Sequence, residues 1–394
     1  MRHLKSFQGR QLMLGLLLCH LNLPQSQITL SENCAIADSC QNSGQNVRIL
    51  FWNVENLFDY KDDTLTADEE FTGNGAMHWS YTKLQTKLAH VAKAILAAGE
   101  WDPPVIIGMC EIENRYVLNK LIYNSPLKSS GYRIIHRNSP DSRGIDVAML
   151  YRADAFTPMF TEWITIKFPF DTTATTRDIL YAKGILFDSD TIHLFVNHWP
   201  SRRGGEAASA PRRNYVASVL RAKIDSILKA DTHYTMRNMR YAIHDQKIPD
   251  ARSLMLDTTS QIADPSLLIM GDFNDEPENE SLQNILKARL DAGDLKPGDL
   301  INMMHLMVNK EGSHKFREHW GLLDQFIVSG SLLDKQHPLQ VDPGSVQIFK
   351  PAFLMEDDLK YLGTKPKRTY LGPRYKGGFS DHLPVVMEIR KLGN

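Results

Sequence analysis

The chain has 394 residues, of which 42% are hydrophobic and 23% charged, and its formal net charge is −1. This composition is that of a globular protein and excludes collagen-like, disordered and polytopic membrane classes. The length is enough for one large domain or two average ones. A nucleic-acid binder usually carries a basic surplus, so any phosphate binding by this chain must come from local patches.

The first residues have the layout of a secretory signal peptide. Three basic residues precede an apolar stretch at 12–18, and a polar stretch follows at 24–27. The apolar stretch is shorter than the ~18 residues of a membrane span, so a retained anchor is the weaker alternative. Lipid attachment at Cys19 is disfavoured because leucines precede it where a small residue is expected. We expect a signal peptide at 1–27 and a secreted or periplasmic protein without stable membrane insertion.

Short apolar runs and helical patterns follow one another from residue 47 onward. The predicted strands are 47–52, 105–110, 132–136, 145–151, 179–187, 191–197, 267–270, 324–328 and 383–389. The predicted helices are 81–98, 115–123, 212–229 and 278–286. Some neighbouring strands read as hairpins, which a purely parallel sheet would not contain. The sequence therefore predicts a mixed α/β sandwich.

The sequence also predicts how the chain is divided. A linker at 28–44 is expected to precede a single domain at 45–392. Within that domain, the stretch 231–253 is polar, rich in arginine and histidine and weakly periodic, so we expect a surface insertion. Cys34 and Cys40 could pair in an oxidising compartment. No cysteine and histidine spacing indicates a zinc site.

Polar side chains stand at the ends of six predicted strands. They are Asn53, Glu111, Asn197 with His198, Asp272 with Asn274, Asp324, and Ser380 with Asp381 and His382. Each alone has an ordinary interpretation as a turn residue, a surface ion pair or a backbone cap. Together they favour a site, because charge beside a buried strand is costly unless a metal or a partner neutralises it.

This set of residue types suits metal-assisted hydrolysis of a phosphoester. Asn53, Glu111 and Asp381 offer the hard oxygen ligands that Mg²⁺ prefers. A metal held there would polarise a phosphoryl oxygen and stabilise the leaving oxygen. His198 and His382 can donate hydrogen bonds or protons near neutral pH.

A carboxylate behind each histidine would fix its tautomer. We expect Asp324 to support His382 in this way. Asp146 could orient His198, although an ion pair between Asp146 and Arg143 is an equal alternative.

These residues in this order resemble the endonuclease/exonuclease/phosphatase superfamily, which has the DNase I-like fold. The resemblance runs from Trp52-Asn53-Val54-Glu55-Asn56, through Gly271-Asp272-Phe273-Asn274, to Ser380-Asp381-His382. It implies an α/β (α+β) four-layer sandwich of two packed mixed β-sheets flanked by helices. It also implies a divalent metal, Mg²⁺ with Mn²⁺ or Ca²⁺ as alternatives.

The resemblance implies a role for each matching position. Asn53 and Glu111 would hold the metal side of the cleft, with Asp381 near the metal. Asp272 would activate or orient the water, and Asn274 would contact the scissile phosphate.

The remaining matches concern the histidines and one arginine. Asp324 matches the acid that supports the last histidine, and His382 matches the histidine near the attacked phosphate. His198 matches the second histidine of the nuclease and phosphodiesterase branches, whereas abasic-site repair members carry asparagine there. Arg177 is similar to an arginine that reaches DNA phosphate, and a surface arginine is the equal alternative.

Two basic segments with aromatic residues are expected to flank the metal and bind substrate. Arg202 and Arg203 follow Trp199 in the first segment, and Arg368 lies near Tyr370 in the second. Phosphates attract the cations, and exposed bases could stack on Tyr370 or Trp199. The alternative is that these are solvated loop charges.

We therefore expect a secreted, monomeric, Mg²⁺-dependent nuclease, most similar to secreted bacterial nucleases. It would hydrolyse phosphodiester bonds of DNA, with RNA also possible, and endonuclease action is favoured. A phosphatase or lipid phosphodiesterase acting on inositol phosphate or sphingomyelin is the alternative. The residues before Asp324 are Gly321-Leu322-Leu323, which lack the tryptophan-cysteine signature of inositol polyphosphate phosphatases. A third alternative is a catalytically silent protein that binds an anion in the cleft.

Overall fold

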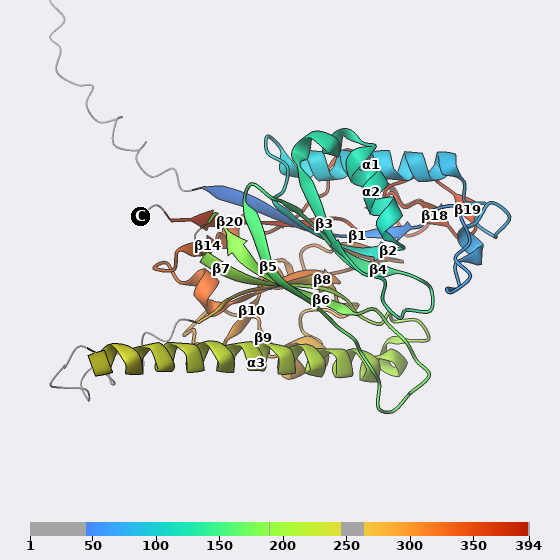
Figure 1. Cartoon of the computed structure of the whole chain (residues 1–394). Coiled ribbons are helices and arrows are strands. Elements are labelled where there is room, and N and C mark those ends of the chain that lie inside the picture. The colour runs from blue at the N-terminus through green and yellow to red at the C-terminus, as the bar shows by residue number, and fades with distance from the viewer. Residues whose placement is uncertain (1–44, 189, 246–263, 393–394) are drawn as a thin grey trace, which may run out of the picture. The chain divides into compact units, whose positions relative to one another are not determined.

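The structure is a computed structural model that describes residues 45–188, 190–245 and 264–392, with only the backbone described at 231–245. The signal peptide expected at 1–27, the linker at 28–44 and the Cys34–Cys40 pair lie outside the described residues. Two large β-sheets pack face to face in the described part of the chain, with helices on their outer faces (Figure 1).

The first sheet has seven strands, ordered β14-β20-β1-β2-β4-β3, with β15 paired to β20. Its strands are β1 (Asn46–Leu57), β2 (Ile106–Ile112), β3 (Tyr132–His136), β4 (Asp146–Arg152), β14 (Leu339–Val341), β15 (Gln347–Ile348) and β20 (Val385–Lys391). The β1–β2 pair is parallel and the other pairs are antiparallel, so the sheet is mixed.

The second sheet also has seven strands, in the order β5-β6-β7-β8-β13-β10-β9. They are β5 (Phe156–Ile164), β6 (Ile179–Leu186), β7 (Asp190–His198), β8 (Ser266–Asp272), β9 (Ala288–Arg289), β10 (Leu300–Asn302) and β13 (Asp324–Ser329). Three short hairpins complete the strands. They are β11 (His314–Phe316) with β12 (His319–Gly321), β16 (Met355–Asp357) with β17 (Thr364–Pro366), and β18 (Tyr370–Leu371) with β19 (Arg374–Tyr375).

Three helices form the outer layers. Helices α1 (Tyr81–Gly99) and α2 (Arg115–Tyr123) lie over the first sheet, and α3 (Glu206–Asp245) lies over the second (Figure 1). The side chains of Ser80 and Asn114 accept hydrogen bonds from backbone N–H groups in the first turns of α1 and α2, which fixes where these helices begin. The predicted four-layer sandwich is therefore confirmed.

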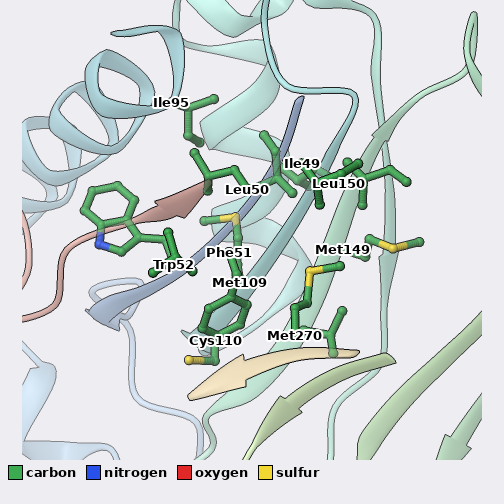
Figure 2. Close-up of a cluster of buried hydrophobic side chains, with 14 of the residues drawn as sticks. Ile49, Leu50, Phe51, Trp52, Ile95, Met109, Cys110, Met149, Leu150 and Met270 are labelled. Carbon is green, nitrogen blue, oxygen red and sulfur yellow. The ribbon is translucent and has the colours of Figure 1, made fainter. Parts of the chain in front are cut away.

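The main core fills the space between the sheets and under α1. Leu50 of β1 lies near Ile95 of α1, while Met270 of β8 approaches β1 and β2 from the second sheet (Figure 2). Both faces of β1 are thus covered, and this explains why its sequence is an unbroken apolar run. Each such buried side chain stabilises the fold by about 1.5–3 kcal/mol. A second cluster joins α3 to the outer face of the second sheet.

All nine predicted strands overlap strands of the structure, and three of the four predicted helices are present. The prediction of a helix at 278–286 was wrong, because this segment forms only a single π-helical turn, Ser281–Ile285. Strand β5 was not predicted, since Pro158 and a bulge interrupt its alternation.

Part of the insertion predicted at 231–253 can be followed. The backbone of α3 continues to Asp245, so the first part of this stretch is helical, and 246–253 lies outside the described residues. In the described part of the chain, no helix combines the length and apolar character that crossing a membrane requires.

Candidate active site

Strand register places three of the predicted site residues in one row. In the parallel pair of β7 and β8, His198 lies opposite Asp272. In the antiparallel pair of β8 and β13, Asp272 lies opposite Asp324. Gly271 permits this close packing, because a Cβ there would lie 2.7 Å from the backbone oxygen of Asn197. The ends of β7 and β8 and the start of β13 therefore meet at one edge of the second sheet.

His382 is bonded to a buried carboxylate at this edge. Its Nδ1 donates to Asp324 Oδ2 at 2.7 Å, and Ser313 Oγ donates to the same oxygen at 2.6 Å. Its Nε2 lies 3.9 Å from Asp272 Oδ2. Burial alone would lower the pKa of His382, but the charges of Asp324 and Asp272 outweigh it and hold that pKa well above its ordinary value. His382 is therefore an imidazolium at neutral pH.

His198 also lies beside Asp272, but its charge state differs from that of His382. Its Nε2 lies 3.7 Å from Asp272 Oδ2, and its buried Nδ1 has no hydrogen-bond partner among the described residues. Burial, together with the charges of Arg177 and Arg143, holds the pKa of His198 well below its ordinary value. His198 is thus a neutral imidazole, whereas His382 is charged.

Asp272 lies between these histidines and is itself nearly fully buried. Burial raises its pKa to about 7, against the lowering effect of His382. Its Oδ1 accepts from the backbone N–H of Asn274 at 3.0 Å, and its Oδ2 accepts from Asn53 Nδ2 at 3.0 Å. A carboxylate with this pKa can accept a proton near neutral pH, which is the property that a general base needs.

Asn53 links the two sheets at the site. Its Nδ2 donates to Glu111 Oε1 at 3.2 Å as well as to Asp272, and its Oδ1 accepts from the backbone N–H of Glu55 at 3.0 Å. The amide nitrogen therefore faces the two carboxylates, while the oxygen is already engaged. Whether Asn53 is an oxygen ligand of a metal stays a prediction; in this structure the residue holds Glu111 and Asp272 together.

A buried network of charges adjoins Glu111. Arg368 donates to Glu55 Oε1 at 3.2 Å and to Asp381 Oδ2 at 2.9 Å, and Lys87 Nζ donates to Thr369 Oγ1 at 2.5 Å. Burial raises the pKa of Glu55 to about 7 and lowers that of Lys87 to about 8. Burial also disfavours the charged form of Asp381, but Arg368 and His382 keep its pKa below the ordinary value.

This acidic set fits a divalent cation. Arg368 joins Glu55 to Asp381, and the side chain of Asn53, two residues before Glu55, joins Glu111 to Asp272, so these carboxylates lie close together. Glu111 and Asp381 are the residues that would hold the ion, because hard carboxylate oxygens suit Mg²⁺. A bound divalent ion would polarise a phosphoryl oxygen and stabilise a leaving oxygen. Glu111 accepts from the backbone N–H of Asn56 at 2.8 Å, which fixes its orientation.

The predicted support of His198 by Asp146 was wrong. Asp146 Oδ2 pairs with His136 Nε2 at 3.0 Å, the neighbour across β3 and β4. The alternative was also wrong, because Arg143 Nη2 donates to Asn56 Oδ1 at 2.8 Å.

Three predicted phosphate-binding arginines differ in how free they are. Arg177 is buried beside Asp141, 3.2 Å away, and donates to the carbonyl of Trp199 at 2.6 Å. Arg202 donates to the carbonyl of Asn274 at 2.7 Å, so it clamps the loop after β8. Arg203 is exposed and forms no ion pair with any described residue. Of the three, only Arg203 keeps its guanidinium available.

The prediction that bases stack on Tyr370 or Trp199 was wrong. Tyr370 is 6% exposed, and its hydroxyl donates to the carbonyl of Met77 at 2.8 Å. Trp199 is 0% exposed and packs edge-on against Phe273. Both rings are therefore part of the hydrophobic core, as aromatic residues next to strands often are.

Sequence reasoning missed His314, Glu55 and Lys87. His314 lies against His382, with ring centroids 4.6 Å apart, and a backbone bridge joins the two residues. Glu55 could have been found, since it stands two residues after Asn53 in the same strand. Lys87 carries no signal in the sequence, because it occupies an ordinary position on an amphipathic helix.

Comparisons with known proteins agree with this architecture. A sequence model of the Endonuclease/Exonuclease/phosphatase family matches residues 48–246 and 245–391. No match was found among curated proteins.

Three of the similar solved structures are the following. A Bacteroides thetaiotaomicron endonuclease/exonuclease/phosphatase family protein has a TM-score of 0.48 at 13% identity, over 89% of this chain and 96% of that one. A mannosyl-6-phosphatase from Bacteroides thetaiotaomicron has a TM-score of 0.46 at 13% identity, over 87% and 99%. TDP2 from D. rerio, complexed with a single-strand DNA product, has a TM-score of 0.44 at 14% identity, over 87% and 98%.

The family match, which spans nearly the whole described chain, makes the protein a phosphoesterase by class. It belongs to the endonuclease/exonuclease/phosphatase family, as the sequence resemblance predicts.

Proposed function

We propose that this protein is an exported, divalent-metal-dependent phosphodiesterase that hydrolyses nucleic acid. The observation that carries the proposal is the pair of buried histidines beside Asp272, whose Nε2 atoms lie 3.7 Å (His198) and 3.9 Å (His382) from Asp272 Oδ2. The imidazolium of His382 suits hydrogen bonding to an anionic phosphate oxygen, and neutral His198 can accept or relay a proton. Asp272, held by Asn53 and the backbone of Asn274, is placed to take a proton from an attacking water.

The charge of the site supports a diester over a more highly charged ester. A phosphodiester carries one negative charge, whereas a monoester carries nearly two at neutral pH. Arg177, Arg202 and Arg368 already pair with acids or carbonyl oxygens, so the Nε2–H of His382, whose Nδ1 is bonded to Asp324, is the main cationic donor left beside Asp272. Inositol polyphosphates would need several more unpaired cations.

The test is hydrolysis of plasmid DNA and of a linear oligonucleotide by purified protein, with Mg²⁺ and with EDTA. We expect Mg²⁺-dependent cleavage that falls at least 100-fold in His198→Ala and in His382→Ala, as loss of a proton-transfer group predicts (about 10²–10⁴-fold). His78→Ala, at an exposed histidine, serves as the matched control and should keep full activity. Cleavage that is undiminished in both site variants, or that proceeds in EDTA, would contradict the proposal.

A substrate panel separates the nuclease from the alternatives. Inositol phosphates, a sugar phosphate and sphingomyelin are offered beside the oligonucleotide. Faster release from any of these would make the protein a phosphatase or a lipid phosphodiesterase. Export rests on the signal peptide expected at 1–27, and fractionation of cells that make the full chain tests it. Activity confined to the cytoplasm would contradict export.

A further inference from the structure

A cavity of about 560 Å³ opens beside the histidines and has no part in the chemistry described above. The residues that line it include Asn274, His314, Phe316, Leu323, Arg203 and His319. The volume falls within the range of small-molecule sites in proteins, about 300–1,000 Å³.

Two residues that line the cavity adjoin the proposed catalytic centre. Asn274 follows Asp272 by two residues, and its Nδ2 donates to the carbonyl of Trp199 at 3.1 Å, which fixes its side chain. His314 lies against His382 and also lines the cavity. The cavity is therefore the nearest space for a group attached to a phosphate beside His382, on the side of His314.

The charges around the cavity nearly balance, which favours an uncharged group. Arg202 pairs with Glu206 at 3.2 Å. Glu276 accepts from the backbone N–H of Leu322 at 2.8 Å and lies 3.7 Å from His319. Arg203 is left to offset Glu276, so the cavity offers no surplus of positive charge for a second phosphate. It suits a neutral group carried next to the scissile phosphate.

Phe316 gives this wall a flat apolar face. It stands on the β11–β12 hairpin and is 64% exposed, in contrast to most large apolar residues of the chain. The guanidinium of Arg317 lies 5.3 Å from the centre of its ring. An exposed phenyl ring paired with a cation is a stacking platform, and base–aromatic stacking contributes about 1–3 kcal/mol per base whatever the base.

We infer that this cavity receives an unpaired nucleobase of the nucleotide next to the scissile phosphate, stacked on Phe316. The inference rests on the proposed phosphodiesterase function and adds the substrate class. A base cannot lie in the cavity and in a duplex stack at once, and removing it from the stack costs a few kcal/mol. The enzyme therefore prefers single strands and unpaired ends to intact duplex.

The test uses a short oligonucleotide in single-stranded and duplex form, and a third version with an abasic residue beside the cleaved bond. Phe316→Ala should lower kcat/KM on the single strand by about 5- to 100-fold, mainly through KM, as loss of one stacking contact predicts. Phe316→Trp should restore it. Phe160→Ala removes a phenylalanine that is 51% exposed on β5 and should leave kcat/KM unchanged.

The abasic substrate adds a cross-check. With the native enzyme, the abasic residue should lower kcat/KM by the same factor as Phe316→Ala lowers it on the intact strand. With Phe316→Ala, the abasic residue should cause no further decrease. Binding of the intact and abasic strands to His382→Ala in EDTA, followed by fluorescence anisotropy, should show the same pattern without turnover.

Three results would overturn the inference. The first is cleavage of the duplex as fast as of the single strand. The second is that neither Phe316→Ala nor the abasic site changes kcat/KM although the native enzyme cleaves the oligonucleotide. Either result rules out the nucleobase site and leaves the proposed function intact. If the native enzyme cleaves no oligonucleotide with Mg²⁺, the proposed function fails, and the nucleobase site fails with it.

Discussion

Replacing Lys87 by methionine tests the buried charge network beneath the site. Lys87 lies on α1 with its ammonium buried, and it donates to Thr369 Oγ1 and to the carbonyl of Phe379. Glu55, Asp381 and Glu111 supply the charges that keep it protonated. Methionine has a similar length and no charge, so Lys87→Met removes the cation with little change in volume.

The size of the effect follows from burial. Lys87 and Glu55 form no direct ion pair, but the ammonium charge acts on the buried carboxylate, and removing the cation leaves that charge uncompensated, which costs about 3–5 kcal/mol in buried pairs. Burial has already raised the pKa of Glu55 from 4.5 to about 7, so the ionised form of Glu55 is the group that loss of Lys87 destabilises most. Because the pKa of Glu55 is higher in the folded protein than in the unfolded chain, the folded protein loses stability as the pH rises from about 4.5 to about 7. Loss of Lys87 raises the pKa further, so the destabilisation is largest at pH 8 and smaller at pH 6.

The assay is urea denaturation of native and variant protein at pH 6 and pH 8, in EDTA so that bound metal does not contribute. Lys87→Met should lose about 3–5 kcal/mol at pH 8 and clearly less at pH 6. Lys93→Met is the matched control, since Lys93 is exposed on the same helix, and it should lose no more than about 1 kcal/mol. A loss below 1 kcal/mol for Lys87→Met, or an equal loss at the two pH values, would refute the reasoning.

Three further predictions concern other parts of the molecule. Asp324→Asn keeps the shape of the side chain but removes the charge behind His382, so kcat should fall about 10²–10⁴-fold when it is measured at a temperature at which the variant is folded; a fall below tenfold would argue against this role. Burial lowers the pKa of His193 from 6.5 to about 4, so the native protein should lose about 3 kcal/mol as pH drops through that window, because the unfolded chain binds the proton first. In urea denaturation at a series of pH values, His193→Gln should not show this loss of stability. Identical pH profiles for the native protein and the variant would contradict the assignment of the loss to His193. Gly271→Ala places a Cβ 2.6 Å from the Cβ of Asn197, so it should cost roughly 1–3 kcal/mol in unfolding free energy, and an unchanged value would be inconsistent with the packing of β7 on β8.

The sequence predicted site residues correctly where they directly adjoin an apolar strand pattern. His198, Asp272 and Asp324 each adjoin an apolar run, and strand pairing alone brings them into one row. The resemblance to a family added the packing of two mixed sheets between helices, which apolar runs do not specify. Asn53 was found for the same reason, but its oxygen is turned to the backbone of Glu55, a detail that depends on a bulge in β1.

The errors arose where a residue's partner is remote in the chain. Tyr370 was expected to be exposed, yet Met77 and neighbouring rings enclose it from distant segments. Asp146 was assigned to His198, whereas its partner His136 is set by the register of β3 and β4. His314 was missed because only the return of β11 toward the C-terminal part of the chain places it beside His382. No spacing in the sequence encodes these contacts.

The central claim is that a charged His382 and a neutral His198 hydrolyse a nucleic-acid phosphodiester with the help of a divalent ion. The most direct measurement is the single-turnover rate of cleavage of a defined single-stranded oligonucleotide with Mg²⁺, for native protein and for His382→Ala. We predict cleavage that EDTA abolishes and that the variant slows at least 100-fold, within the ~10²–10⁴-fold range of a lost proton-transfer group. Cleavage that persists in EDTA, or that the variant carries out at the native rate, would contradict the account.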